Sequence, residues 1–144
     1  MSIVNQFNAF AADFEFCVAD DNWTRLEKYF LEDASYWNVG GPDPEITGRA
    51  AILDYLRDNV ASNDRRFESR DLKAITEPAV TGNRLARKWR VTYRLSGAPD
   101  LVLEGEARYE FEGELIRSLE EEITPESMRQ YIEWMQKYGS MLNA

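Results

Sequence analysis

Hydrophobic residues recur every three or four positions in the first part of the chain, which is the spacing of one helix face. This pattern predicts a long helix that begins near Ile3, a second helix capped by Asn22 and a third capped by Thr47. The aromatic and β-branched run 34–39, between the second and third helices, predicts a short strand. A glycine–proline turn at residues 40–42 ends that strand.

The hydrophobic period changes from helical to alternating at Arg66. Alternation interrupted by turn residues predicts four strands in a meander, with the bounds Arg66–Glu77, Arg84–Leu95, Leu101–Phe111 and Leu115–Ile123. A capping threonine, a proline and a glutamate at 124–126 then begin a last helix. Its apolar stripe is Met128, Tyr131, Ile132, Met135 and Tyr138. The order predicts an α+β fold with one curved sheet against helices, in which residues 1–124 form the main unit and 125–144 a C-terminal helix and tail of the same domain.

The composition of the chain disfavours several classes of partner and excludes several classes of catalytic site. The chain of 144 residues has a net charge of −9, which disfavours nucleic acid and membrane surfaces as partners. It contains no histidine, so catalysis by Ser-His-Asp or Cys-His sets and imidazole zinc sites are excluded. Cys17 is the single cysteine and cannot form an intramolecular disulfide. Asp13 and Glu15 interrupt the apolar N-terminus, unlike a signal peptide. We expect a cytoplasmic protein without metal or cofactor.

Four segments, in this order and spacing, carry a resemblance to a known family: 33–38 (DASYWN), 47–49 (TGR), 85–92 (LARKWRVT) and 113–116 (GELI). Over roughly residues 5–124 the chain resembles the nuclear-transport-factor-2-like superfamily and its SnoaL-like branch. The resemblance implies a conical α+β barrel with a pocket between helices and concave sheet, in a homodimer formed through the sheet. Members include ketosteroid isomerases, polyketide cyclases, limonene-type epoxide hydrolases, dehydratases, dioxygenase small subunits and non-catalytic binders, so the chemistry stays open.

Strand pairing predicts which residues face the pocket. Counting outward from the turns pairs Phe111 with Leu115 and Leu95 with Leu101. The apolar members then share one face, which we expect to be concave. Its predicted rows are Arg87–Tyr109–Arg117, Trp89–Ala107–Leu119, Val91–Gly105–Glu121 and Tyr93–Leu103–Ile123. The other face alternates basic and acidic residues and is expected to be solvated.

Three charged residues on the apolar face, Arg87, Arg117 and Glu121, require an explanation, because an unpaired buried charge is costly. One interpretation is that they pair with one another or lie at the open rim. The other is that Glu121 projects into a ligand pocket as an acid or base, its pKa raised by apolar walls. The arginines would then orient an anionic group.

Tyr36 and Asn38 are the other candidate pair, because alternation places them on one face. A Tyr-x-Asn here holds the attacking water in the resembled epoxide hydrolases. Those enzymes also need an Arg-x-Asp, and the counterpart Arg90–Val91–Thr92 lacks the acid. In a ketosteroid isomerase, the position of Asn38 is occupied by the catalytic base and that of Phe14 by the oxyanion-hole tyrosine; asparagine cannot take a proton. Neither the epoxide hydrolase nor the isomerase mechanism fits this sequence. Tyr36 and Asn38 are also compatible with a purely structural role.

The sequence therefore favours a protein that binds a small apolar or cyclic molecule and carries out proton transfer, of the isomerase, cyclase, dehydratase or hydrolase type. The expected catalytic residues are Glu121, Tyr36 and Asn38. The expected ligand-binding residues are Arg87, Trp89, Tyr109, Arg117, Phe14 and Tyr55. Two alternatives remain: a non-catalytic ligand binder, and a dimeric partner module whose cone is filled by Trp89, Tyr93 and Tyr109.

Overall fold

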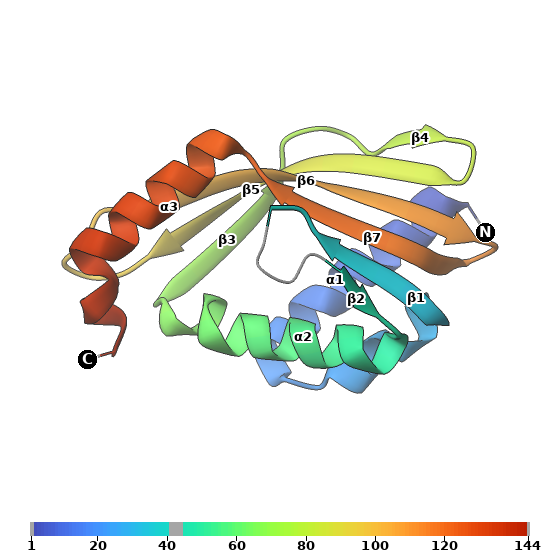
Figure 1. Ribbon diagram of the computed structural model, residues 1–144, viewed down its shortest axis with the longest axis horizontal. Helices are drawn as coiled ribbons and strands as arrows, with labels where there is room; N and C mark the ends of the chain where they lie inside the picture. Colours follow the sequence, from blue (N-terminus) through green and yellow to red (C-terminus); the bar gives the residue numbers. More distant parts are fainter. Residues whose placement is uncertain (1, 41–44, 144) are drawn as a thin grey trace.

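The chain folds into one curved, open sheet with helices packed on its inner face (Figure 1). A computed structural model describes residues 2–40 and 45–143. Residues 41 and 42 of the predicted glycine–proline turn lie outside this range. The elements in chain order are α1 (Ile3–Asp20), the 3-10 helix η1 (Trp23–Tyr29), β1 (Phe30–Asn38), β2 (Glu45–Thr47), α2 (Arg49–Ser62), η2 (Asp64–Arg66), β3 (Ser69–Ala74), β4 (Ala79–Thr81), β5 (Arg84–Arg94), β6 (Leu101–Glu112), β7 (Leu115–Ile123), α3 (Pro125–Tyr138) and η3 (Gly139–Asn143).

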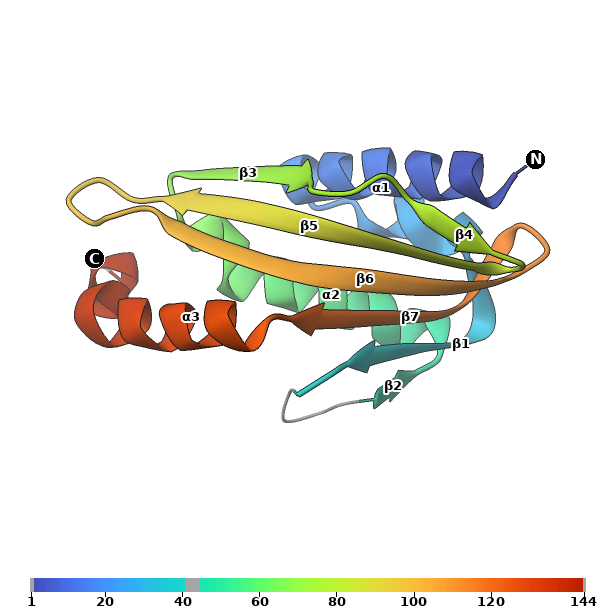
Figure 2. The same ribbon diagram turned by 90° about the horizontal axis from the view of Figure 1, so that it is seen from above.

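The sheet confirms the α+β class. Its strand order is β2-β1-β7-β6-β5-β3, and β4 pairs with β5 off this path. The β1–β7 pair is parallel and the other pairs are antiparallel. Since β2 and β3 end the path without pairing to each other, the sheet is curved as expected for a conical barrel but stays open. Figure 2 shows its outer face, which is not covered by any helix of the described residues.

Two hydrophobic clusters lie on the inner face. The larger one packs α1, η1 and α2 against the sheet around Phe10, Leu26 and Ile52. The smaller one packs α3 against the last residues of β5 and the first residues of β6, around Val91 and Trp134. Trp89 contacts both clusters and therefore marks the boundary between them.

The N-terminal helices partly follow the prediction. The first helix is confirmed, whereas the second is a seven-residue 3-10 helix in which the Asn22 side chain makes no capping hydrogen bond. The strand begins at Phe30 rather than residue 34, because Phe30 already pairs with Ile116 of β7. Thr47 lies in β2 and does not cap α2, whose N-cap is Gly48.

The meander strands were predicted well, apart from the first, which is reduced to Ser69–Ala74. The predicted register was wrong by two residues: Gly105 lies opposite Trp89, and Glu121 opposite Ala107. An even shift preserves which side chains share a face. The predicted faces therefore hold.

Arg117 is the exception. A bulge interrupts the β6–β7 pairing between Glu110 and Phe111, so that Phe111 pairs with Ile116 and Glu110 with Ser118. The extra residue reverses the alternation beside the turn. Ile116 is buried there, whereas Arg117 points outward and pairs with Asp33 at 2.9 Å. The prediction that Arg117 faces the pocket is wrong.

The last helix begins as predicted: the Thr124 hydroxyl accepts a hydrogen bond from the Ser127 backbone N–H. Its inward face follows the predicted stripe in part, since Tyr131, Met135 and Tyr138 pack against the smaller cluster. Trp134 is buried and donates its indole N–H to the Pro99 carbonyl at 2.8 Å, while Met128 and Ile132 are exposed. In the described residues no helix has both the length and the apolar character to cross a membrane.

Candidate functional site

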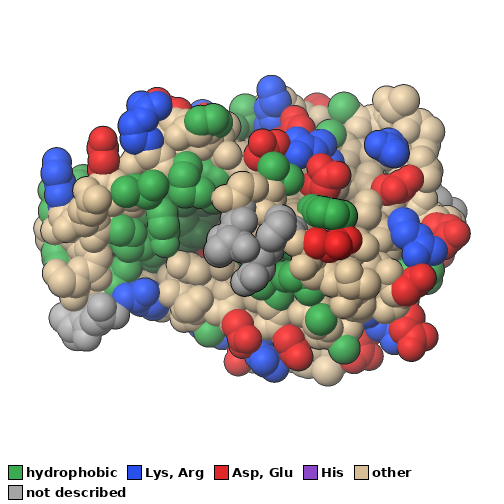
Figure 3. Space-filling view, in the orientation of Figure 1, with side chains coloured by type: hydrophobic (Ala, Val, Ile, Leu, Met, Phe, Trp, Pro, Cys, Tyr) green, Lys and Arg blue, Asp and Glu red, His purple; other side chains and the backbone are tan. Residues whose placement is uncertain are grey.

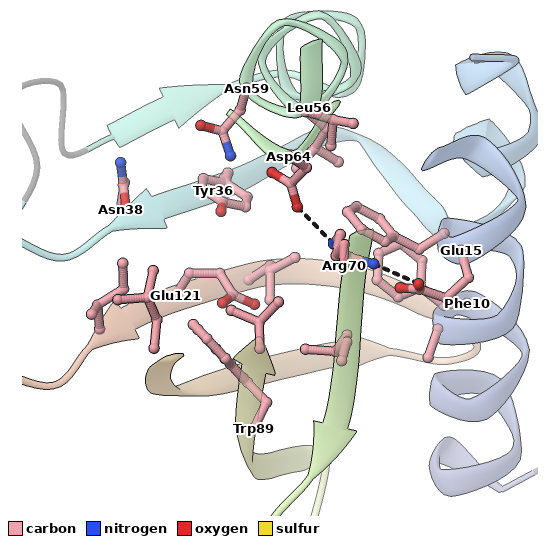
Figure 4. Close-up of a pocket in the computed structure, with 18 of the residues that line it drawn as sticks. Phe10, Glu15, Tyr36, Asn38, Leu56, Asn59, Asp64, Arg70, Trp89 and Glu121 are labelled. Atoms are coloured by element: carbon pink, nitrogen blue, oxygen red, sulfur yellow. Dashed lines mark hydrogen bonds and ion pairs between the residues drawn. The ribbon is translucent and has the colours of Figure 1, made fainter. Parts of the chain in front are cut away.

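A cavity of about 220 Å³ lies between the inner face of the sheet, α1 and α2. Hydrophobic side chains gather on the surface between α3 and α2 (Figure 3), and Figure 4 shows the cavity in close-up. Every predicted site residue except Arg117 lines it, namely Phe14, Tyr36, Asn38, Tyr55, Arg87, Trp89, Tyr109 and Glu121. Their lining position is a fact of the structure, and their catalytic or binding roles remain predictions.

Glu121 projects into the cavity from β7, where it lies between Asn38 of β1 and Ala107 of β6. Burial among apolar groups raises the pKa of its carboxyl to about 7. The charge of Arg87 and the nearby Trp89 N–H oppose this rise, although no hydrogen bond of normal geometry joins Trp89 to the carboxyl. Glu121 keeps some accessible surface because it faces the cavity. A carboxyl with this pKa is available as an acid or a base near neutrality.

The two neighbouring glutamates have a different environment. Glu120 and Glu122 point to the outer face, where each pairs with Arg108 at 3.0 Å. The three successive carboxylates therefore cannot converge on one ion. No group of metal-ligating side chains occurs in the described part of the chain.

Arg87 and Trp89 occupy adjacent inward positions of β5. Arg87 lies in one row with Ala107 and Glu121, so the small alanine separates the cation from the carboxyl. The guanidinium carbon lies 4.9 Å from the centre of the Phe7 ring, and no ion pair to Arg87 is found within residues 2–40 and 45–143.

The Trp89 ring lies across Gly105 of β6. A Cβ at this glycine would come within 2.4 Å of the Trp89 ring and 2.5 Å of the Glu122 carbonyl oxygen. Glycine is therefore required here by close approach, and it lets the indole extend toward Glu121 (Figure 4).

Tyr36 and Asn38 share the inner face of β1 as predicted, but their polar ends point differently (Figure 4). The Tyr36 hydroxyl points toward the space beside Glu121; burial and the carboxylate charge raise its pKa well above the usual value. Asn38 instead points toward α2 and donates its amide to the Tyr55 hydroxyl at 2.9 Å. The structure brings Tyr36 and Glu121 together, while one of the two Asn38 N–H groups is already bonded to Tyr55.

A polar cluster at the opposite end of the cavity was not predicted from the sequence. Arg70 of β3 donates to Asp64 at 2.6 Å and to Glu15 of α1 at 2.5 Å, as Figure 4 shows. The Tyr93 hydroxyl donates to Asp64 at 2.9 Å. Arg70 lies opposite Tyr93, so alternation from the predicted inward Tyr93 would have placed Arg70 inside. No local sequence signal indicates that Glu15 reaches the same site.

Comparisons with known proteins agree with this architecture. The profile of the SnoaL-like domain matches residues 10–119. No curated protein matches. Among solved structures, an NTF2-like protein of unknown function from Burkholderia pseudomallei is 13% identical with a TM-score of 0.66, covering 89% of this chain and 95% of that one.

Two further solved structures have names that refer to a ligand or an activity. TerC, co-crystallised with polyporic acid, is 14% identical with a TM-score of 0.65 over 89% of this chain and 98% of its own. An LEH-like epoxide hydrolase from M. tuberculosis is 12% identical with a TM-score of 0.64, and the match covers 92% of this chain and 91% of that one. At these identities the similarity establishes the fold alone. Because the family profile covers most of the chain, the protein belongs to the SnoaL-like domain family and has the NTF2-like fold.

Proposed function

We propose that this protein binds a small, largely apolar cyclic molecule in the cavity and catalyses a proton-transfer reaction on it, with Glu121 as the acid or base. Isomerisation, cyclisation, dehydration and hydrolysis all belong to this reaction class. Tyr36 would donate a hydrogen bond to an oxygen of the molecule, and the aromatic walls would exclude water.

One observation carries the proposal: the Glu121 carboxyl faces an apolar cavity without an ion pair from any described residue, and burial raises its pKa to about 7. The other carboxylates that line the cavity, Asp64 and Glu15, are both bound by Arg70. Glu121 is therefore the lining carboxyl best placed to exchange a proton.

A panel of three cyclic probes tests the proposal: 3-cyclohexenone for isomerisation, cyclohexene oxide for hydrolysis and 3-hydroxycyclohexanone for dehydration. We expect turnover of at least one probe, reduced at least 100-fold by Glu121→Gln, because general acid–base catalysis typically contributes about 10²–10⁴-fold. Glutamine has nearly the same shape, so circular dichroism should show an intact fold.

Glu120→Gln is the matched control, since Glu120 is the neighbouring carboxylate on the outer face. This variant should retain the wild-type rate. A Glu121→Gln protein with full activity removes Glu121 from the mechanism.

A non-catalytic ligand binder is the second candidate. The observation that favours it is the commitment of the Asn38 amide to Tyr55, which leaves fewer free donors to assist a reaction. Binding of aromatic probes without turnover of any panel member would support this alternative.

A further inference from the structure

Two buried side-chain donors in the described chain have no hydrogen-bond partner: Nε of Arg87 and Nε1 of Trp89. Both belong to inward positions of β5, and both residues line the cavity next to Glu121. A buried donor without an acceptor typically costs about 1–3 kcal/mol. Two such donors at one place indicate that the missing acceptor is a ligand.

The charges around the cavity indicate the sign of that ligand. Arg70 is paired with two carboxylates, those of Asp64 and Glu15, so this cluster has no positive charge left for a ligand. Arg87 has no carboxylate partner in the described residues, and its guanidinium lies over the face of the Phe7 ring. The cavity end beside Glu121 therefore has one uncompensated cation and an indole N–H, both of which favour an anionic oxygen.

We propose that the cavity takes a small aromatic or cyclic carboxylate, whose charged group accepts hydrogen bonds from Arg87 and Trp89 while Glu121 is protonated. This inference rests on the proposed ligand-binding function of the same cavity. It also assigns Glu121 the role of an acid, because an ionised Glu121 would repel the bound carboxylate.

The size of the cavity agrees with a ligand of one or two rings. An apolar cavity of about 150 Å³ holds benzene, and this one measures about 220 Å³. The rings of Phe14, Tyr36 and Tyr109 line it and provide apolar contact for the body of the ligand.

The proposal predicts that anion binding is coupled to protonation. The groups that face Glu121 are Tyr36 on β1, Arg87 and Trp89 on β5, and Tyr109 on β6. Arg108, on the outer face of β6, acts on Glu121 only through its charge. Burial raises the pKa of Glu121 to about 7 and moves those of Tyr36 and Tyr109 further above their ordinary value, so Glu121 is the carboxyl that titrates near neutrality. The polar cluster of Arg70, Asp64 and Glu15 lines the far end of the cavity.

The test compares 2-naphthoate with its neutral analogue 2-naphthamide by isothermal titration calorimetry of the full chain. Naphthoate stays ionised above pH 5, because carboxylic acids titrate near pH 4. At pH 6 we expect naphthoate to bind at least tenfold more tightly than naphthamide. Because only the protonated protein is competent, the naphthoate dissociation constant should rise about 30-fold between pH 6 and pH 8.5.

Variants assign these effects to residues. Arg87→Gln should weaken naphthoate binding at least tenfold and leave naphthamide binding within twofold, since a charge-assisted hydrogen bond is lost. Trp89→Phe, which keeps the ring and removes the N–H, should weaken naphthoate about fivefold. Glu121→Gln should bind naphthoate with little dependence on pH. Arg90→Gln, on the outer face of the same strand, is the control and should change nothing.

Each remaining outcome overturns the inference. Equal affinity for both probes, or naphthoate binding that Arg87→Gln leaves unchanged, shows that the two donors serve no anion. Binding of naphthamide alone refutes the inference and leaves the proposed function standing, whereas binding of neither probe counts against both. Should Arg87→Gln fail to fold, Arg87→Lys keeps the charge without the planar donor fork and should still weaken naphthoate severalfold.

Discussion

Arginine and glutamate form ion pairs on the outer face of the sheet, whereas Arg87 and Glu121 on the inner face form none with any described residue. On the outer face, Arg108 contacts the carboxylates of Glu106, Glu120 and Glu122 at 2.7–3.0 Å. On the inner face, Arg87 has no carboxylate within ion-pair distance among the described residues, and Glu121 has no cation.

Strand pairing explains the difference. Arg108 lies directly opposite Glu120, so opposite charges meet across adjacent strands. Arg87 and Glu121 lie two strands apart with Ala107 between them. The charges on the outer face are thus neutralised by ion pairs within the sheet. On the inner face, Arg87 and Glu121 form no ion pair with each other and face the cavity. The same sheet therefore has one solvated face and one face that lines the cavity.

Gly105→Ala breaks the inner face and has the largest expected effect. The new methyl group would meet the Trp89 ring and the fixed carbonyl oxygen of Glu122. We expect a loss of roughly 3 kcal/mol in unfolding free energy, at the upper end of overpacking costs. Urea denaturation measures it. Gly139→Ala is the control, because its Cβ would be 3.4 Å from its nearest neighbour, Met135, and should cost little. Equal stability of the two variants would contradict the tight packing at Gly105.

Glu121→Gln removes the inner carboxyl and should stabilise the protein in a pH-dependent way. The folded-state pKa of about 7 lies above the ordinary value of 4.5, so the folded protein holds a proton that the unfolded chain releases. Wild-type stability should therefore fall as the pH rises from 4.5 to 7, and the variant should avoid this fall. We expect a gain of about 3 kcal/mol at pH 8 and none at pH 4.

Urea titrations of both proteins at pH 4, 6 and 8 measure this difference. A constant difference across these values would mean that Glu121 does not titrate in this range.

Arg108→Gln and Arg87→Gln compare the two faces directly. Arg108→Gln loses three partly exposed ion pairs and should cost about 1 kcal/mol, less at high salt. Arg87→Gln should cost at most about 0.5 kcal/mol, because the lost contact with Phe7 is offset by removal of an unpaired buried donor. Thermal unfolding at low and high salt separates the two, and a larger loss for Arg87→Gln would reverse the comparison.

Glu120→Gln should have the smallest effect. Its carboxylate is about two-fifths exposed and shares Arg108 with two other glutamates. We expect a change below about 0.5 kcal/mol. Urea titration at pH 8 measures it, and a gain as large as that of Glu121→Gln would show that removing a carboxylate has the same effect on both faces.

Much of the site followed from alternation. The period of two places Glu121, Arg87 and Trp89 inside and Arg90 outside, whatever even register the strands adopt. It failed at Arg117, because a bulge adds one residue and reverses the side-chain direction. A bulge depends on how two strands pair and leaves no reliable local signal.

The sequence by itself determined the α+β class, the N-terminal and C-terminal helices and the inward position of Glu121, since each follows from a local period or a capping pattern. Only the tertiary structure decided that Trp134 turns inward, because several rotations of that amphipathic helix bury apolar groups and the sheet selects one. It also joined Glu15 to Arg70, which are 55 positions apart. The pKa of Glu121 likewise depends on the walls that surround it, and these come from separate elements of the chain.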